Sequence, residues 1–413
     1  MPKLSSRPVE GSGTPPGKRL LVLGAGPAQL GLLAAARERG LYVIALDRDP
    51  AAPGFRYADR RAIISTEDEQ GIERLAGAEG VEGIIAPGID WPVGIAARIA
   101  ERLGLPHPID GAIASAAVSK QRQRERLAEA GVPQPTWQIV KSPDEALQQT
   151  GAKSWVVKAP DRQGQKGLSL VRSKDDLPTA IARAIEESRS GVAIVEELVD
   201  GPEVTVNAFS VRGEFHPLTV TDRLTAEPPA FGVARAHVWP SEAGGQPADV
   251  ARAAIDALGI QDGPTYTQLR IGADGPQVIE VAARLGGGHD AELVHAALGV
   301  DLNGLALQAA LGESIWSAAL HVVPQVGGAV VRFLVPPTGV LQEIEGVEEA
   351  LGVEGVQEVR VYREPGYVFG PFLRAADRAG AVLVVGESRE EALQRADEAV
   401  RLIRFEVGAE SLV

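Results

Sequence analysis

The stretch TQLRIGADGPQVIEVAARLGGG, residues 267–288, decides the fold and points to one functional site. Its hydrophobic pattern predicts two strands joined by a turn at ADG. Gln268 and Glu280 then fall on neighbouring strands, and Arg284 follows four residues after the glutamate. Oxygen ligands on adjacent strands suit a Mg²⁺ ion that bridges nucleotide phosphates, and a nearby arginine can stabilise charge on a transferred phosphoryl group. Taken alone, the stretch is also compatible with a surface hairpin that carries exposed charges.

The placement of lysines upstream of this stretch indicates a phosphate ligand. The chain has only eight lysines. Lys120 opens a charged helix, and Lys158 ends an apolar strand, where a charge is costly to bury unless it meets an anion. The segment QGQKG, residues 163–167, can bring backbone N–H groups close to phosphate oxygens. A solvated loop with ordinary lysines is the alternative, and the absence of a G-x-x-x-x-G-K-[ST] motif excludes a P-loop ATPase.

An acidic segment lies between these lysines and the first stretch. IVEELVDGPEVTV places Glu196, Glu197 and Glu203 around a predicted strand and turn. Each cluster alone is explained by exposed surface charge. All of them in this order favour a single nucleotide-binding site.

The N-terminal part predicts a doubly wound parallel α/β domain, because strands alternate with helices up to about Pro108. The apolar run KRLLVLGAG turns from a strand into a helix at Gly24 and Gly26. GAGPAQLG resembles a dinucleotide fingerprint with Asp47 as the ribose ligand, but Gln29 occupies the position of its third glycine. We therefore favour a tight strand-to-helix turn over a dinucleotide site.

The composition excludes several classes of protein. The 413 residues are 45% hydrophobic and 23% charged, which is typical of a folded chain with roughly two to four domains. A net charge of -14 disfavours nucleic acid as a partner, and no apolar run is long enough to predict a membrane span. The absence of cysteine excludes thiolate nucleophiles and cysteine-bound metals, and it fits a cytoplasmic location. Residues 1–17 predict a flexible leader without the apolar core of a signal peptide.

Together these motifs resemble those of the ATP-grasp superfamily, and within it the carboxylate–amine ligases related to L-amino acid (dipeptide) ligases. The resemblance covers about residues 19–407 and includes LDRDPAAPGFRYAD and RIAERLGLP in the N-terminal part. It implies an α/β (α+β) class: an N-terminal doubly wound parallel-sheet domain, an ATP-grasp fold and a C-terminal α+β domain. After the leader, we expect these domains at 18–112, 113–315 and 316–413, with a lid subdomain at about 135–195.

The resemblance also implies functional residues, with ATP and Mg²⁺ (Mn²⁺ as an alternative) as cofactors. The residues expected at the ATP phosphates and in the lid above them are Lys120, Lys158, Gln163, Gly164, Lys166 and Gly167. The adenine hinge is expected at Glu196, Glu197 and Val199, and the ribose contact at Glu203. The expected metal ligands are Glu280 and Gln268, and the residues expected to act in catalysis are Arg284 and Lys158.

Two departures from the family pattern concern the metal. The family usually has a glutamate at position 268, and its frequent E-x-N-x-R pattern is here E-V-A-A-R, which lacks the asparagine ligand. An amide oxygen can ligate Mg²⁺, but without charge, so we expect one metal to be weakly held or missing. The E-x-A-A-R form resembles the dipeptide-ligase-like branch.

The implied reaction converts ATP and a carboxylate into an acyl phosphate and ADP, and an amine then attacks to form an amide. Gly287, Gly288 and His289 are candidate substrate residues, although a hydrogen-bonded structural histidine is at least as good an interpretation of His289. The expected partners are a small carboxylate and an amine, without nucleic acid or membrane, and a homodimer stays open. Two other functions stay open. One is an enzyme acting on bicarbonate or a purine-pathway ribonucleotide, which should show a basic cradle for a phosphate. The other is a degenerate ATP-binding regulatory protein, which Gln268 would explain.

Overall fold

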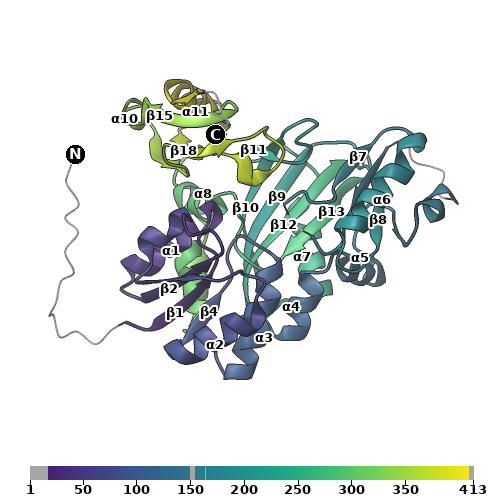
Figure 1. Cartoon of the computed structure of the whole chain (residues 1–413), viewed down its shortest axis with the longest axis horizontal. Coiled ribbons are helices and arrows are strands. Elements are labelled where there is room, and N and C mark those ends of the chain that lie inside the picture. The colour runs from purple at the N-terminus through teal and green to yellow at the C-terminus, as the bar shows by residue number, and fades with distance from the viewer. Residues whose placement is uncertain (1–16, 149–153, 163, 409–413) are drawn as a thin grey trace.

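The computed structural model describes residues 17–148, 154–162 and 164–408 (Figure 1). The expected leader, apart from Gly17, and the expected lid residue Gln163 lie outside the described residues. The rest is a mixed α/β structure with a parallel sheet near the N-terminus and a large antiparallel sheet, which confirms the expected class. Every helix in the described part of the chain is too short or too polar to span a bilayer.

The N-terminal unit is a four-stranded parallel sheet in the order β3-β2-β1-β4. Its strands are β1 (Arg19–Leu23), β2 (Tyr42–Asp47), β3 (Arg60–Ile63) and β4 (Gly83–Ile85). The helices of this unit are α1 (Leu30–Glu38), α2 (Glu69–Glu79) and α3 (Trp91–Leu103). The central strands β1 and β2 bury almost every side chain, as parallel strands covered on both faces do.

The glycine-rich turn after β1 is filled by the protein's own side chains. Gly24 has a φ of 106°, and a Cβ at this position would lie 3.0 Å from the Gln29 side chain. Gln29 is buried and its Nε2 donates to the Pro87 carbonyl at 2.7 Å. Asp47 Oδ2 accepts a hydrogen bond from the Ala25 N–H at 3.0 Å. Gln29 therefore occupies the space that a pyrophosphate would need, and Asp47 holds the turn.

An eight-stranded sheet in the order β13-β12-β9-β10-β11-β14-β18-β16 forms the centre of the molecule. Its first five strands are β13 (Gly275–Ala282), β12 (Gly263–Gly272), β9 (Glu203–Val211), β10 (Glu214–Thr225) and β11 (Ala234–Trp239). The helices around them are α4 (Gly111–Ala117), α5 (Lys120–Glu129), α7 (Pro247–Leu258), α8 (Asp290–Leu298) and α9 (Leu302–Ala310). One hydrophobic core contains Leu21 of β1, Val206 of β9 and Ile255 of α7, so it joins the N-terminal unit to this sheet.

A smaller antiparallel sheet in the order β5-β8-β6-β7 lies at the right of Figure 1. Its strands are β5 (Trp137–Val140), β6 (Trp155–Lys158), β7 (Ser169–Val171) and β8 (Ala193–Glu197). Helix α6 (Leu177–Glu187) packs Leu177, Ile181 and Ala184 against it in a separate hydrophobic core. A lid that moves as a unit needs a hydrophobic core of its own, as this sheet and helix have. The assignment of this region as a lid stays a prediction.

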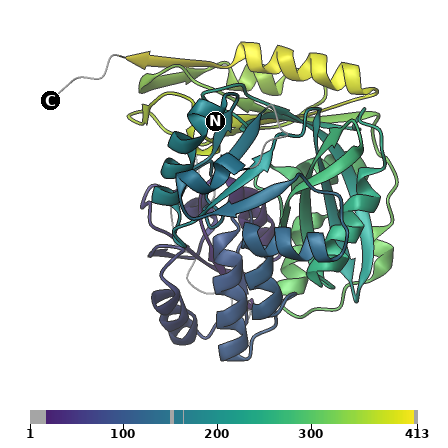
Figure 2. The same cartoon turned by 90° about the vertical axis from the view of Figure 1, so that its right-hand side faces the viewer.

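The C-terminal strands continue the central sheet. β14 (Gly328–Leu334) pairs with β11, and β18 (Gly380–Gly386) and β16 (Val356–Val361) follow it. A three-stranded sheet completes the region with β15 (Gly339–Glu345), β17 (Val368–Phe369) and β19 (Arg404–Gly408). Helices α10 (Val347–Leu351) and α11 (Arg389–Leu402) accompany these strands, and α11 lies along the top of Figure 2.

Candidate active site

Lys120 is presented by the first turn of α5. The Ser119 hydroxyl caps this helix, so Lys120 stands at the helix N-terminus, where the helix dipole favours anions. Lys120 Nζ lies 2.7 Å from Glu280 Oε1 and donates to the Arg162 carbonyl at 3.2 Å. Burial would lower the pKa of Lys120, but Glu280 and Asp90 outweigh it and raise that pKa. Lys120 is therefore a permanent cation beside the Glu280 carboxylate.

Lys158 ends β6 and is held by a buried carboxylate. Its Nζ lies 2.7 Å from Glu196 Oε2, and Arg124 Nε lies 2.7 Å from Oε1 of the same glutamate. Burial would raise the pKa of Glu196, but Arg124 and Lys158 outweigh it and lower that pKa. Burial, helped by Arg124 and opposed by Glu196, lowers the pKa of Lys158. One carboxylate thus faces two cations, and the excess positive charge suits a phosphate ligand.

The expected adenine hinge follows β8. The Glu196 side chain is 2% exposed and is engaged in the ion pairs with Lys158 and Arg124, so its side chain acts on the lysine. The Glu197 side chain is exposed. The Val199 carbonyl accepts a hydrogen bond from Arg270 Nη1 at 2.9 Å. A hinge that reads adenine through backbone groups stays a prediction.

Glu203, the expected ribose contact, begins β9 between two arginines. Its Oε1 lies 2.5 Å from Arg223 Nη1, and its Oε2 lies 3.6 Å from Arg270 Nε. Burial would lower the pKa of Arg223, but Glu203 leads the groups that raise it. The two arginines hold the carboxylate in place from both sides. The hydroxyl groups of a bound ribose would donate further hydrogen bonds to the same carboxylate.

Gln268 and Glu280 are direct cross-strand partners on β12 and β13. Residues opposite one another in an antiparallel pair share a face of the sheet. Burial would raise the pKa of Glu280, but Lys120, Lys158 and Arg284 outweigh it and hold that pKa at about 2. An anionic carboxylate beside an amide oxygen is a set of hard oxygen ligands that fits Mg²⁺ bound together with nucleotide phosphates. Glu280 and Gln268 would therefore hold the ion.

Arg284 follows β13 and is held from three sides. Its Nη2 lies 2.7 Å from Asp90 Oδ1, and its Nη1 donates to the Leu285 carbonyl at 2.9 Å. Its guanidinium carbon lies 5.4 Å from the centre of the Tyr266 ring. The Tyr266 hydroxyl in turn accepts a hydrogen bond from Gln268 Nε2 at 3.2 Å. Because Asp90 precedes α3, the N-terminal unit positions an arginine that the central sheet carries.

The described part of the glycine-rich loop has a left-handed backbone at Gly164, Gln165 and Gly167. Successive N–H groups in such a conformation form concave sites for anions. The Lys166 side chain is exposed. Gln165 Oε1 accepts a hydrogen bond from the Ala375 N–H at 3.4 Å, so this loop already reaches the C-terminal region.

Gly287 and Gly288 allow close packing of backbone rather than space for a ligand. A Cβ on Gly287 would lie 2.8 Å from the Gly88 carbonyl oxygen, and a Cβ on Gly288 would lie 2.6 Å from His237 Nε2. The Gly288 N–H donates to Asp290 Oδ2 at 3.0 Å. The glycines let this turn pack against the N-terminal unit and β11. The sequence analysis reads them as room for a substrate, and their substrate role stays a prediction.

His289 is engaged through both ring nitrogens. Its Nε2 shares a short hydrogen bond with the Tyr362 hydroxyl, and its Nδ1 lies 2.9 Å from Arg360 Nη1. Arg360 Nη1 also lies 2.8 Å from Glu292 Oε1. Burial is the main reason that the pKa of His289 is lowered to about 4, so the ring is neutral at pH 7. These contacts agree with the structural interpretation of His289.

The sequence analysis missed several residues that complete the site. Arg124 lies one helical turn after Lys120 on α5, and this spacing was the signal that would have grouped them. Asp90 and Tyr266 carry no motif and are brought in by the tertiary fold. Each comes from a different segment, so only the folded chain unites them.

Comparisons with known families agree with this geometry. The family "Phosphoribosylglycinamide synthetase, ATP-grasp (A) domain" matches residues 118–223, which include Lys120, Lys158 and the predicted hinge. The family "L-amino acid ligase C-terminal domain 2" matches residues 332–408. The chain therefore contains an ATP-grasp domain, and it is an enzyme that forms carbon–nitrogen bonds.

Relatives of this ATP-grasp enzyme span nearly its whole length. It is 28% identical over 419 residues to the formate-dependent phosphoribosylglycinamide formyltransferase of Burkholderia vietnamiensis, covering 95% of this chain and 96% of the relative. It is also 28% identical over 390 residues to the uncharacterized protein y4rH of Sinorhizobium fredii, covering 89% of this chain and 78% of the relative.

Solved structures show the same fold. The L-amino acid ligase from Bacillus licheniformis superimposes with a TM-score of 0.81 at 22% identity, covering 96% of this chain and 100% of that chain. The phosphoribosylglycinamide synthetase from Anaerococcus prevotii superimposes with a TM-score of 0.76 at 21% identity, covering 95% and 100%. At these identities the likeness establishes the ATP-grasp fold alone.

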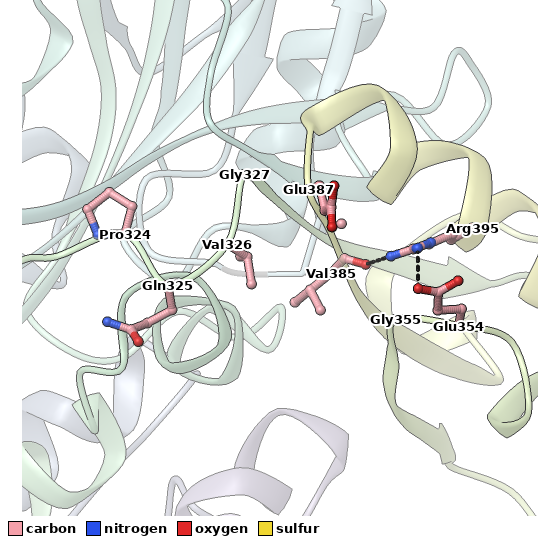
Figure 3. Close-up of a pocket in the computed structure, with 10 residues that line it drawn as sticks. Pro324, Gln325, Val326, Gly327, Glu354, Gly355, Val385, Glu387 and Arg395 are labelled. Carbon is pink, nitrogen blue, oxygen red and sulfur yellow. Dashed lines mark hydrogen bonds and ion pairs between the residues drawn. The ribbon is translucent and has the colours of Figure 1, made fainter.

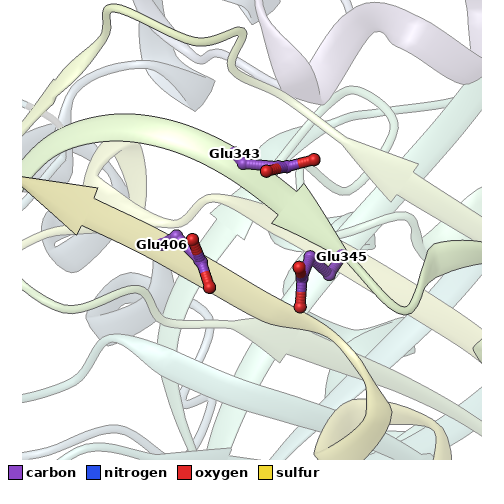
Figure 4. Close-up of side chains that lie close together, drawn as sticks. All are labelled: Glu343, Glu345 and Glu406. Atoms are coloured by element: carbon purple, nitrogen blue, oxygen red, sulfur yellow. The ribbon is translucent and has the colours of Figure 1, made fainter.

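Two other features of this ATP-grasp chain share no residue with the site. A hollow of about 480 Å³ opens between the start of β14 and α11, where Arg395 is already paired with Glu354 at 2.9 Å (Figure 3). Glu343, Glu345 and Glu406 place carboxylate oxygens within 4.8 Å of one another on β15 and β19 (Figure 4). Arg404 lies 2.8 Å from Glu345, and nothing else at this exposed cluster indicates a bound cation.

Proposed function

We propose that this protein is an ATP-dependent carboxylate–amine ligase that forms an amide or peptide bond through an acyl phosphate and releases ADP and phosphate. The observation that carries the proposal is the convergence of Lys120, Lys158 and Arg284 on Glu280. Despite burial, all three lower the pKa of that carboxyl, which stands at about 2. With Arg124 these are four cations against three carboxylates, Glu280, Glu196 and Asp90, so one positive charge is left over, which a triphosphate would neutralise.

In the first step, an oxygen of the carboxylate substrate attacks the γ-phosphoryl group and ADP leaves. Lys120 and Lys158 bind phosphate oxygens, and Arg284 balances the charge that develops on the transferred group. Mg²⁺ held by Glu280 and Gln268 would supply further charge neutralisation and orient the leaving group. Positioning and electrostatics carry this chemistry, which needs no covalent nucleophile from the chain.

In the second step, the amine attacks the acyl carbon, the carbon–nitrogen bond forms, and phosphate leaves as the nitrogen loses a proton. The acyl phosphate must be kept from water, because it hydrolyses readily. The β5-β8-β6-β7 sheet with its glycine-rich loop would serve as the lid. The contact of Gln165 with Ala375 supports this role, because it joins the loop to the far side of the site.

The match of residues 332–408 to an L-amino acid ligase domain favours amino acids as substrates. The curated relatives named as formate-dependent phosphoribosylglycinamide formyltransferases favour a second candidate, a purine-type reaction on a ribonucleotide. The two candidates differ in what the amine substrate carries. A ribonucleotide brings a phosphate dianion, whereas an amino acid brings one carboxylate.

ADP release by the purified protein with MgATP tests the proposal across amino acids singly and in pairs, with formate, bicarbonate and glycinamide ribonucleotide as further substrates. We expect release that needs both an acid and an amine, and that is lost in Lys158→Ala. The exposed residue Lys141 provides the matched control, Lys141→Ala, which should retain full activity. Release with the ribonucleotide alone would establish the second candidate. Tight ATP binding without release for any pair would favour the degenerate regulatory protein.

A further inference from the structure

Arg378 differs from the other arginines near the proposed site. It lies between the short turn at residues 375–377 and β18, and it is 7% exposed. Its guanidinium carbon lies 3.6 Å from the centre of the Phe333 ring, and its Nη2 donates to the Ala234 carbonyl at 2.6 Å. Its Nε has no hydrogen-bond partner among the described residues.

The neighbouring arginines are neutralised and Arg378 is not. Arg223, Arg284 and Arg360 each have a carboxylate oxygen within ion-pair distance, as described above. No carboxylate of the described residues lies within 4.0 Å of the Arg378 guanidinium. The buried carboxylate of Asp290 acts to raise the pKa of Arg378, but it makes no ion pair with it and is held by the Gly288 N–H and by Asn207. A buried guanidinium without a counter-ion is costly, so a ligand that brings one negative charge would be stabilised here.

The rings that surround Arg378 can exclude water without themselves supplying charge. Phe333 packs against His237 with ring centres 5.8 Å apart and against His289 at 6.4 Å. Tyr362 closes this group through its hydrogen bond to His289. Burial lowers the pKa of both histidines to about 4, so the rings are neutral at pH 7. We call His237, His289, Phe333, Tyr362 and Arg378 the C-terminal polar cluster.

This cluster lies within electrostatic range of the residues that we propose act on ATP. Tyr266 lies under Arg284, and both Arg223 and Asp290 lie close enough to affect its hydroxyl. Tyr266 and Arg223 also act on the Arg378 guanidinium. Gly288, four residues after Arg284, packs so closely against His237 that a Cβ on it would lie 2.6 Å from Nε2. The cluster therefore borders the place where the acyl phosphate would form.

We propose that Arg378 binds a substrate carboxylate other than the one that is phosphorylated, and so selects substrates that carry this second carboxylate. The inference rests on the proposed ligase function. The carboxylate has two sources, the free carboxyl group of an amino acid that serves as the amine, or a second carboxyl group of the acid. One unpaired guanidinium among neutral rings matches one negative charge, which favours a carboxylate over a phosphate dianion.

Two substrate comparisons in the ADP-release assay test the inference and separate the sources. In the first, each of the twenty common L-amino acids is compared with its carboxamide as the amine. In the second, L-aspartate and L-glutamate are compared with L-asparagine and L-glutamine as the acid. We expect Arg378→Met to raise KM roughly 10- to 100-fold for the carboxylate form in one comparison, and to leave its neutral counterpart unchanged. Arg378→Lys should recover part of the loss, because it restores the charge without the planar fork.

Arg374→Met is the matched control, because Arg374 belongs to the same segment but its side chain is 55% exposed. Ligand-induced thermal stabilisation by the same compounds, with wild type and each variant, gives a second readout that needs no turnover. A wild type that does not prefer the carboxylate form in either comparison overturns the inference, as does a preference that Arg378→Met leaves intact. Protection by ribose 5-phosphate that depends on Arg378, without protection by any carboxylate, also overturns it. Absence of ADP release in wild type would contradict the ligase, while the thermal readout would still decide the role of Arg378.

Discussion

The two ends of the proposed site hold buried charge in opposite ways. At the nucleotide end, Lys120 and Lys158 each lie 2.7 Å from a carboxylate oxygen, and the pKa of Glu280 is held at about 2. In the C-terminal polar cluster, the pKa of His237 and of His289 is lowered to about 4 by burial, and Arg378 has no carboxylate partner among the described residues. The first end holds charges in close pairs. The second combines neutral rings with one guanidinium that has no carboxylate partner, and Asp290, Glu292 and Arg360 border these rings.

This contrast fits what each end must bind. ATP is the same in every turnover, so a fixed set of paired charges can be organised for it in advance. The second substrate is what distinguishes one ligase of this fold from another. A mostly neutral, aromatic surface with one unpaired cation selects among ligands by whether they carry a negative charge. We therefore propose that catalysis occurs at the nucleotide end and that the C-terminal polar cluster selects the substrate.

The largest expected effect comes from removing a cation at the nucleotide end. Arg284→Met should lower kcat about 10³-fold, because it removes a cation that stabilises the transferred phosphoryl group. Asp90→Asn should lower kcat about tenfold with the KM for ATP unchanged, because Asp90 positions Arg284 through the 2.7 Å ion pair. Steady-state ADP release with the identified substrate pair measures both variants.

Asp90→Glu is the control for positioning and should recover part of the lost rate. An equal rise in the KM for ATP in the Asp90 variants would contradict a positioning role, because it would place the aspartate at the nucleotide. A kcat in Arg284→Met close to wild type would remove this arginine from the chemistry.

The same contrast explains how much of the site the sequence could predict. Lys120, Lys158 and Glu280 lie in segments whose local patterns carry the information: a helix start, a strand end and a hairpin. The hairpin places Gln268 and Glu280 on neighbouring strands, as its sequence predicts. Their direct pairing depends on a register shift after Gln268, which the sequence does not predict, because an unbroken register would set Gln268 opposite Ile279. The parallel N-terminal sheet was predicted from the alternation of strands with helices.

The C-terminal polar cluster could not be predicted in this way. Its members come from β11, the turn before α8, β14, the end of β16 and the loop before β18, and each is an ordinary residue in its own segment. The pairing of β14 with β11 brings Phe333 and His237 together, and no local pattern announces which strand will extend the central sheet. Burial then decides the chemistry, since an exposed histidine with the same neighbours in sequence would titrate normally.

The second prediction tests whether the histidines of the C-terminal polar cluster are neutral in the folded protein. Because the folded-state pKa of His289 is about 4 and the usual value is 6.5, the unfolded chain binds more protons between these values. The free energy of unfolding should therefore fall as the pH is lowered from 6.5 towards 4, by up to about 3 kcal/mol for this residue. His289→Gln should reduce the slope by about 1.4 kcal/mol per pH unit between pH 6 and 5. Urea unfolding at a series of pH values measures this.

His237→Gln should reduce the slope to a similar extent, because burial also lowers the pKa of His237 to about 4. His216, which lies on β10 outside the C-terminal polar cluster, provides the comparison variant, His216→Gln. A slope that stays unchanged in both cluster variants would contradict the prediction, because it would show that the pKa of these rings in the folded protein is close to the usual value.

The smallest expected effect concerns the one uncharged position at the nucleotide end. Gln268→Glu places a second carboxylate directly across from Glu280, which should strengthen binding of Mg²⁺ and lower its half-saturating concentration about tenfold. The change also puts two carboxylates on one face of the sheet, so without metal the variant should be less stable than wild type and should regain stability when Mg²⁺ is added. ADP release and thermal unfolding across a Mg²⁺ titration measure the two effects, with the exposed residue Gln261 as the control, Gln261→Glu.

A Mg²⁺ dependence identical to wild type would place the ion away from β12, and Glu280 would then hold the metal without the help of its cross-strand partner. A lower half-saturating Mg²⁺ concentration with no gain in rate would mean instead that Gln268 limits how tightly the metal binds but not how fast the phosphoryl group is transferred. The uncharged side chain at position 268 would then set metal occupancy, while the charged residues around it set the rate.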